Sequence, residues 1–145
     1  MLEDTPKIKY FIYCRKSSDD EDRQILSIPA QKRELNEFAE KNNLEIAGIF
    51  SEERSAYKIG RPEFNKMLGQ VELGIASGLI VWNVNRIARN SKDGGNVIYA
   101  IDEGKIVEIR TPSKVYRNEP DDKFYLQIEF TMAKKSSDDN SRDTK

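Results

Sequence analysis

Histidine is absent from this chain of 145 residues. Its absence excludes serine–histidine triads, histidine metal ligands and acid–base catalysis by imidazole. Cysteine occurs only once, as Cys14, which excludes an intramolecular disulfide framework and is typical of a reducing compartment. We therefore expect a cytoplasmic protein.

Long hydrophobic runs are also missing from the sequence. No apolar stretch approaches the ~18 residues that a membrane-spanning helix needs, and the first residues do not have the pattern of a signal peptide. We therefore expect no membrane partner.

An excess of one sign of charge is lacking as well, since 24 basic and 25 acidic residues give a net charge of −1. This balance argues against a uniformly basic nucleic-acid-binding protein. The charges are unevenly distributed, however, because residues 54–92 contain seven Lys or Arg and only two Asp or Glu, a local balance of +5. The middle of the chain can therefore face a polyanion.

The hydrophobic pattern that is present alternates between strands and helices. Short apolar runs predict strands at residues 10–14, 44–50, 78–82 and 106–109. Helical spacing, with Ser27 as an N-cap, Pro62 in a first turn and Gly104 as a terminator, predicts helices at residues 27–42, 61–71 and 91–101. This order predicts an α/β domain with a mostly parallel central sheet and helices on both faces.

A different pattern begins at Pro120. Asp121 and Asp122 are suited to capping a long helix, and apolar residues lie around much of its circumference: Phe124, Tyr125, Leu126, Ile128, Phe130, Met132 and Ala133. One domain surface cannot cover all of them, so we expect an oligomerisation helix. We accordingly divide the chain into a catalytic-type domain at residues 1–120 and the start of an interface helix at residues 121–145.

Arginine and serine follow three successive predicted strands. Arg15 and Ser17 come after the first, Ser55 and Arg61 after the second, and Arg86 and Arg89 after the third. The carboxyl ends of parallel strands meet at one edge of a sheet, where ligands bind. Guanidinium groups hold phosphoryl oxygens, and a hydroxyl supplies a nucleophile, so this edge is predicted to be a phosphodiester site. We expect Tyr13 to lie in the core with its hydroxyl free to reach the site.

Four separated runs carry a resemblance to a known family: YCRKSS, SIPAQKREL, SEERSAYKIGRPEF and VWNVNRIARNSKDGG. Their order and separations resemble the serine recombinases, which include resolvases, invertases and large serine integrases, over about residues 8–145. The resemblance implies that Ser17 is the nucleophile and that the phosphate-binding arginines are Arg15, Arg61, Arg86 and Arg89. It implies supporting roles for Tyr13, Gln31, Glu52 and Ser55.

Two positions depart from the pattern of that family. Asn85 stands where the family has an aspartate just before the paired arginines, and Glu52 replaces a commoner aspartate. Loss of a carboxylate beside Arg86 removes a charge-assisted contact, at an expected cost of about 1.5–3 kcal/mol in alignment or chemistry.

The resemblance implies site-specific strand exchange on double-stranded DNA through a 5′-phosphoserine intermediate. No ATP, metal ion or other small-molecule cofactor is expected, because the covalent link conserves the phosphodiester bond energy and arginines can stabilise the developing charge. The implied assembly is a homodimer on each site and a tetramer during exchange, with a separate DNA-binding region after the long helix. The acceptor of the serine proton stays open between an arginine, water and Glu52.

Two other classes of function are compatible with the residues. One is an assembly module that oligomerises through the helix from Asp121, with Asn85 marking lost catalysis. The other is a metal-dependent nuclease that uses the acidic residues Asp19, Asp20, Asp121 and Asp122.

Overall fold

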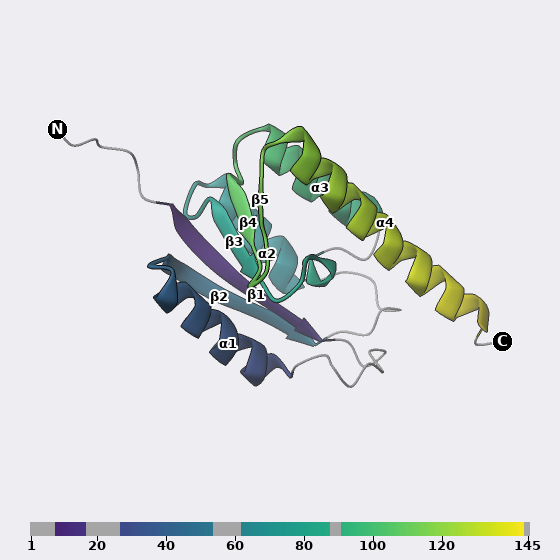
Figure 1. The fold of residues 1–145 in the computed structure, drawn as a ribbon, viewed down its shortest axis with the longest axis horizontal. Coiled ribbons are helices and arrows are strands. Elements are labelled where there is room, and N and C mark those ends of the chain that lie inside the picture. The colour runs from purple at the N-terminus through teal and green to yellow at the C-terminus, as the bar shows by residue number, and fades with distance from the viewer. Residues whose placement is uncertain (1–7, 17–26, 54–61, 88–90, 144–145) are drawn as a thin grey trace.

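The computed structural model describes residues 8–16, 27–53, 62–87 and 91–143, and the side chains of all of these except 91–92 and 132–143. In chain order the elements are β1 (Lys9–Lys16), α1 (Ile28–Lys41), β2 (Glu45–Glu53), α2 (Pro62–Glu72), β3 (Gly78–Val81), the 3₁₀ helix η1 (Val84–Arg86), α3 (Ser91–Asp102), β4 (Glu108–Arg110), β5 (Val115–Arg117) and α4 (Pro120–Asp143). Figure 1 shows their arrangement.

The strands form one five-stranded sheet in the order β2-β1-β3-β4-β5. The pairs β1–β2, β1–β3 and β3–β4 are parallel, whereas β5 runs antiparallel to β4. The predicted α/β class with a mostly parallel sheet is therefore confirmed. Strand β5 was not predicted, because it has only three residues and its central Tyr116 is its one buried side chain.

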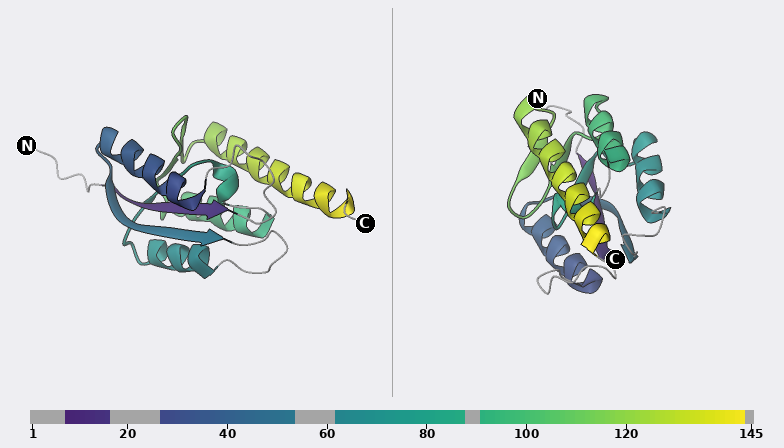
Figure 2. Two further views of the ribbon diagram at one scale, coloured as in Figure 1. Left: turned by 90° about the horizontal axis from the view of Figure 1, so that it is seen from below. Right: turned by 90° about the vertical axis from the view of Figure 1, so that its right-hand side faces the viewer.

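Helices cover both faces of the sheet, with α1 on one face and α2 and α3 on the other (Figure 2). Strand β1 is buried on both sides, as expected for a central parallel strand. Phe11 and Tyr13 face the core beneath α2 and α3, whereas Tyr10, Ile12 and Cys14 face α1. The alternation along β1 thus connects the two layers of core.

Strands β1 and β2 extend further than their apolar runs predicted. Arg15 and Lys16 pair in register with Glu52 and Glu53, so the ladder continues through polar residues. The strand predicted at residues 44–50 therefore ends too early, because residues 51–53 also belong to β2. Backbone pairing, which does not depend on side-chain polarity, explains the extension.

The predicted helix signals are present in the structure. The Ser27 hydroxyl accepts the amide N–H of Ala30 at 3.2 Å, which caps α1 as expected. Gly104 has φ +78° just after α3, the left-handed conformation that favours glycine. These local features fix the start of the first crossover helix, α1, and the end of the third, α3.

Polar contacts hold the first turn of α4 in place. The Asp122 carboxylate accepts the amide N–H of Arg117 at 2.9 Å and lies 3.6 Å from the Lys114 ammonium, while Lys123 forms a 2.6 Å ion pair with Asp102 on α3. The Lys114 ammonium also lies 5.1 Å from the centre of the Tyr125 ring. The start of α4 is thus bound to both β5 and α3.

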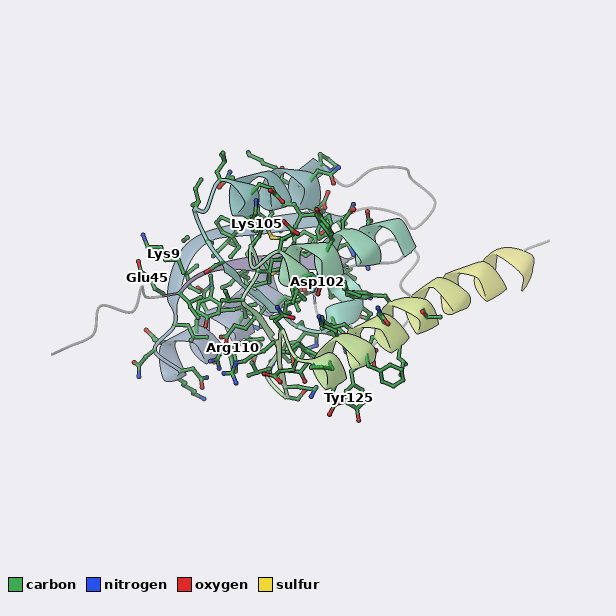
Figure 3. All side chains as sticks on the ribbon, turned by 90° about the horizontal axis from the view of Figure 1, so that it is seen from above. Lys9, Glu45, Asp102, Lys105, Arg110 and Tyr125 are labelled. Carbon is green, nitrogen blue, oxygen red and sulfur yellow. The ribbon has the colours of Figure 1, made fainter. Side chains whose placement is uncertain are left out.

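Apolar contacts continue along α4, which packs against α3, η1 and β5. Leu126 and Phe130 are buried in the main core, whereas Phe124 is 61% exposed and Ile128 is 41% exposed. Figure 3 places Tyr125 on the outer side of the helix. The domain surface thus covers only part of the apolar circumference of the helix.

A buried carboxylate joins three strands at the amino end of the sheet. Glu108 accepts hydrogen bonds from the Tyr10 hydroxyl, from Arg110 at 2.6 Å and from Arg117 at 3.1 Å. Burial raises the pKa of the Glu108 carboxyl, but the hydrogen bonds from these three donors outweigh burial and lower the pKa below its usual value. Nearby, Lys9 and Glu45 lie together at the same end of the sheet (Figure 3).

Across the residues that the structure describes, no helix combines the length and the hydrophobicity that crossing a membrane would require.

Candidate active site

The predicted site lies where β1 and η1 meet, at the carboxyl ends of neighbouring parallel strands. The alternation between strand and crossover brings Arg15 at the end of β1 beside Asn85 and Arg86, which follow β3. Residues that are 70 positions or more apart in the chain are therefore in direct contact. The prediction that these strand ends converge is confirmed for Arg15 and Arg86.

Arg15 is 1% exposed, and its guanidinium group is bound to the backbone of η1. Its Nε donates to the carbonyl of Arg86 at 3.0 Å, and its Nη2 donates to the carbonyl of Asn85 at 3.1 Å. The last carbonyls of a short helix have no partner within that helix, so Arg15 satisfies them. Arg15 thus holds η1 against the end of β1.

Arg86 is 6% exposed and has contacts on both sides of the site. Its Nη1 donates to the carbonyl of Arg15 at 3.2 Å, and its Nε donates to the side-chain oxygen of Asn85 at 3.1 Å. Asn85 therefore still contacts Arg86 as an aspartate there was expected to do, although without a negative charge. Two cations, Arg15 and Arg86, are concentrated at this edge of the sheet, which makes it suitable for an anion.

Gln31 approaches the same point from α1. Its Nε2 donates to the carbonyl of Arg15 at 3.1 Å, and the residue is fully buried. The Arg15 carbonyl thus accepts donors from α1 and from η1. The supporting position predicted for Gln31 lies in the site and fixes the backbone two residues before Ser17.

Tyr13 and Glu52 lie together beneath α2. The Tyr13 hydroxyl donates to the Glu52 carboxylate at 2.7 Å, so the expectation that this hydroxyl is free to reach the site is wrong. Tyr13 also packs against Phe64, with ring centroids 5.5 Å apart. Tyr13 is core, as expected, and its polar end is directed to a neighbouring strand.

Several predicted site residues lie outside the described residues, namely Ser17, Ser55, Arg61 and Arg89, as do Asp19 and Asp20 of the nuclease interpretation. Of the other two carboxylates in that interpretation, Asp122 is bound to Arg117 and Lys114 at the start of α4. Among the described side chains, no group of three or more His, Cys, Asp or Glu is placed to hold a metal ion.

Sequence reasoning missed the 3₁₀ helix that supplies carbonyl acceptors to Arg15. Asn83 begins it, because its side-chain oxygen accepts the amide N–H of Asn85 at 3.1 Å. An asparagine directly after a buried strand is a turn signal that indicates such a cap.

Cys14 lies next to Arg15 in the chain but on the opposite face of β1. Burial raises the pKa of its thiol to about 11, although Lys32 opposes the shift. A thiol that stays protonated at neutral pH is a poor nucleophile. Cys14 is therefore a core residue and is unsuited to be a nucleophile at neutral pH.

Comparisons with known proteins agree with this arrangement. The model of the family "Resolvase, N terminal domain" matches residues 10–145. A search among curated proteins finds no match.

Solved structures share the fold. A resolvase family site-specific recombinase from Streptococcus pneumoniae is 24% identical, with a TM-score of 0.63 over 95% of this chain and 93% of that one. The N-terminal catalytic domain of TP901-1 integrase is 18% identical, with a TM-score of 0.62 over 90% and 97% of the two chains. The C-terminal catalytic domain of ISC1926 TnpA, an IS607-like serine recombinase, is 17% identical, with a TM-score of 0.58 over 72% and 69%.

Proposed function

The chain belongs to the resolvase N-terminal domain family and is a serine site-specific recombinase catalytic domain, and from this membership we propose that Ser17 is the nucleophile that cleaves double-stranded DNA. The Ser17 Oγ attacks the scissile phosphorus, the bond from phosphorus to the deoxyribose 3′-oxygen breaks, and a 5′-phosphoserine link forms. The leaving 3′-oxygen takes up a proton, and the serine hydroxyl gives one up. The number of phosphoester bonds is unchanged, so rejoining needs no ATP.

The observation that carries this proposal is the pair Arg15 and Arg86, in which each guanidinium group donates to the backbone carbonyl of the other residue. The pair lies at the edge of the sheet where the sequence predicted a phosphodiester site. A fixed guanidinium group stabilises the charge that develops on phosphoryl oxygens without reorganising during the reaction. We assign phosphate contacts to Arg86, Arg89 and Arg61. The resemblance implies a phosphate contact for Arg15 too, but its Nε and Nη2 donate to backbone carbonyls, so we assign Arg15 the role of holding the backbone of Arg86 in place.

The nearest competing function is an assembly module that has lost catalysis at Asn85. The 3.1 Å contact between Asn85 and Arg86 favours the enzyme, because the residue still orients the arginine. Covalent trapping on DNA separates the two functions.

The test is a suicide substrate, a duplex nicked just 5′ of the scissile phosphate so that the released 3′-hydroxyl fragment dissociates. A pool with a randomised central sequence removes the need to know the target site. The wild type is expected to form a covalent adduct in EDTA, Ser17→Ala to form none, and Ser18→Ala to form it normally, because on an extended chain Ser17 shares a face with Arg15 and Ser18 does not. An adduct with Ser17→Ala, or a strict requirement for magnesium, contradicts the proposal.

We also propose that residues 121–145 form an interface helix between copies of this chain, a dimer on each DNA site and a tetramer during exchange, in the cytoplasm. Phe124 and Ile128 are exposed on α4 and are suited to such a contact. Burial of a large apolar side chain contributes roughly 1.5–3 kcal/mol before the costs of association. Sedimentation should show self-association at high concentration that the variant Phe124→Ser, Ile128→Ser, Met132→Ser loses, whereas a strictly monomeric wild type contradicts the proposed interface.

A further inference from the structure

Glu52 makes an unusual set of contacts near the end of β2. The side chain is almost completely buried, at 6% exposure of the residue. One carboxylate oxygen accepts the Tyr13 hydroxyl at 2.7 Å and the amide N–H of Phe64 at 3.0 Å, and the other accepts the amide N–H of Glu63 at 3.2 Å. The carboxylate therefore connects β1, β2 and the first turn of α2.

We propose that Glu52 is a positioning residue that fixes the amino terminus of α2 against the sheet, and that it is not the acceptor of the nucleophile's proton. The inference rests on the proposed function for the reaction that it serves. The contacts themselves are a property of the fold.

The first turn of α2 needs a partner of this kind. The first amide N–H groups of a helix have no acceptor within the helix, and Pro62 at the first position has no N–H to donate. Glu63 and Phe64 supply the next two, and Glu52 accepts both. A negative charge at this end also interacts favourably with the helix dipole.

The position of Glu52 in the chain gives these contacts a functional consequence. Strand β2 ends at Glu53 and α2 begins at Pro62, so the side chain of Glu52 joins the two ends between which residues 54–61 run. Arg61, to which we assign a phosphate contact, is bonded directly to Pro62. The carboxylate that holds the backbone of residues 63 and 64 therefore fixes the end of α2 to which Arg61 is joined in the chain.

The same contacts argue against proton transfer by Glu52. A general base must direct a lone pair at the proton that it removes. Three donors in the protein occupy three of the roughly four lone-pair sites of the Glu52 carboxylate, and Tyr13 and Phe64, which pack against each other, lie beside it. With Glu52 excluded, we infer that the acceptor of the serine proton is an arginine or water.

The test compares Glu52→Gln and Tyr13→Phe with Glu53→Gln, which makes the same chemical change as the first variant at the exposed neighbouring residue. Hydrogen exchange of the amides of Glu63 and Phe64 is followed by NMR, and the rate of adduct formation on the suicide pool is measured from pH 5 to pH 9. In Glu52→Gln we expect about tenfold faster exchange of both amides and an adduct rate that is lower by one constant factor at every pH. Tyr13→Phe should give a smaller effect in the same direction, and Glu53→Gln should match the wild type.

Two outcomes overturn the inference. Unchanged exchange at Glu63 and Phe64 in Glu52→Gln shows that Glu52 does not fix the helix. A pH profile that loses its dependence only in Glu52→Gln shows that Glu52 takes the proton. Absence of any adduct from the wild type contradicts the proposed function instead, and the amide exchange still decides the role of Glu52 in the fold.

Discussion

The guanidinium group of Arg15 donates to the carbonyl of Arg86 at 3.0 Å, and the guanidinium group of Arg86 donates to the carbonyl of Arg15 at 3.2 Å. Each arginine thus fixes the backbone of the other, although the two side chains carry the same charge. The carbonyl dipoles offset the repulsion between the two cations. Removing either side chain leaves a buried carbonyl without that donor, so stability and alignment of the site depend on the same two residues.

Arg15→Lys should destabilise the fold, because an ammonium group lacks the planar fork that reaches the carbonyls of Asn85 and Arg86 together. The expected loss in the free energy of unfolding is about 1.5–3 kcal/mol, measured by urea denaturation. The control is Arg33→Lys, the same change at an exposed arginine on α1, which should stay within about 0.5 kcal/mol of the wild type. Equal stability of the two variants would mean that the buried contacts of Arg15 contribute nothing.

Asn85→Asp should keep the fold and either raise the rate of adduct formation or leave it unchanged. The side-chain oxygen of Asn85 already accepts from Arg86, and a carboxylate there makes the contact charge-assisted. Asn85→Ala removes the acceptor and should slow the reaction, with about tenfold for each 1.4 kcal/mol lost. Single-turnover rates on the suicide pool provide the measurement. A slower Asn85→Asp variant would show that asparagine is an adaptation of this enzyme.

Glu108→Gln should make the free energy of unfolding less dependent on pH in the acid range. The pKa of Glu108 is lowered in the folded chain, so its contribution is complete above the unfolded value of about 4.3 and is lost as the pH falls through the folded value. At pH 7 the variant should be less stable by about 2–3 kcal/mol, because Arg110 and Arg117 lose a charged partner. Urea denaturation from pH 7 to pH 3 should show the difference shrinking, and a constant difference would contradict the assignment.

Gly94→Ala should disturb the packing of α4 on α3. A Cβ atom at Gly94 would lie 2.8 Å from the Phe130 ring, so the helices must separate, at a cost of about 1–3 kcal/mol. The adjacent Gly95 is the matched control, because a Cβ atom there meets nothing within 4 Å. Gly95→Ala should stabilise the protein by about 0.5–1 kcal/mol through helix propensity. The measurement is the change in melting temperature of each variant by thermal unfolding. Equal changes in the two variants would exclude a close contact between residue 94 and Phe130.

The order and type of the main elements could be predicted from the sequence because they follow local rules. The run Tyr10 to Cys14 is apolar on every position, and Ser27 and Gly104 mark helix ends through their own chemistry. The convergence of Arg15 and Arg86 followed from the parallel order of strands alone. Local patterns of this kind need no knowledge of distant contacts.

The partners of the site residues could not be predicted in the same way. Tyr13 and Glu52 meet across two strands, and the acceptors of Arg15 are backbone carbonyls, which every residue carries and no pattern distinguishes. In the sequence Glu108 is a single polar residue within a predicted strand, a pattern that does not indicate burial. It is nevertheless buried, because it accepts hydrogen bonds from three side chains on β1, β4 and β5. Such contacts depend on how the strands are aligned with one another, and the sequence alone does not specify that alignment.

The antiparallel strand β5 has a consequence for the direction of α4. After β4 the chain turns back toward the amino end of the sheet, so α4 starts there and runs in the direction of the parallel strands until it passes their carboxyl ends (Figure 1). Its 24 residues correspond to a length of roughly 36 Å at about 1.5 Å per residue. Had the fifth strand been parallel, a helix packed back along the sheet would carry the chain away from the edge where Arg15 and Arg86 lie. The three residues of β5 therefore set the direction of α4, whose far half extends past the edge of the sheet where Arg15 and Arg86 lie.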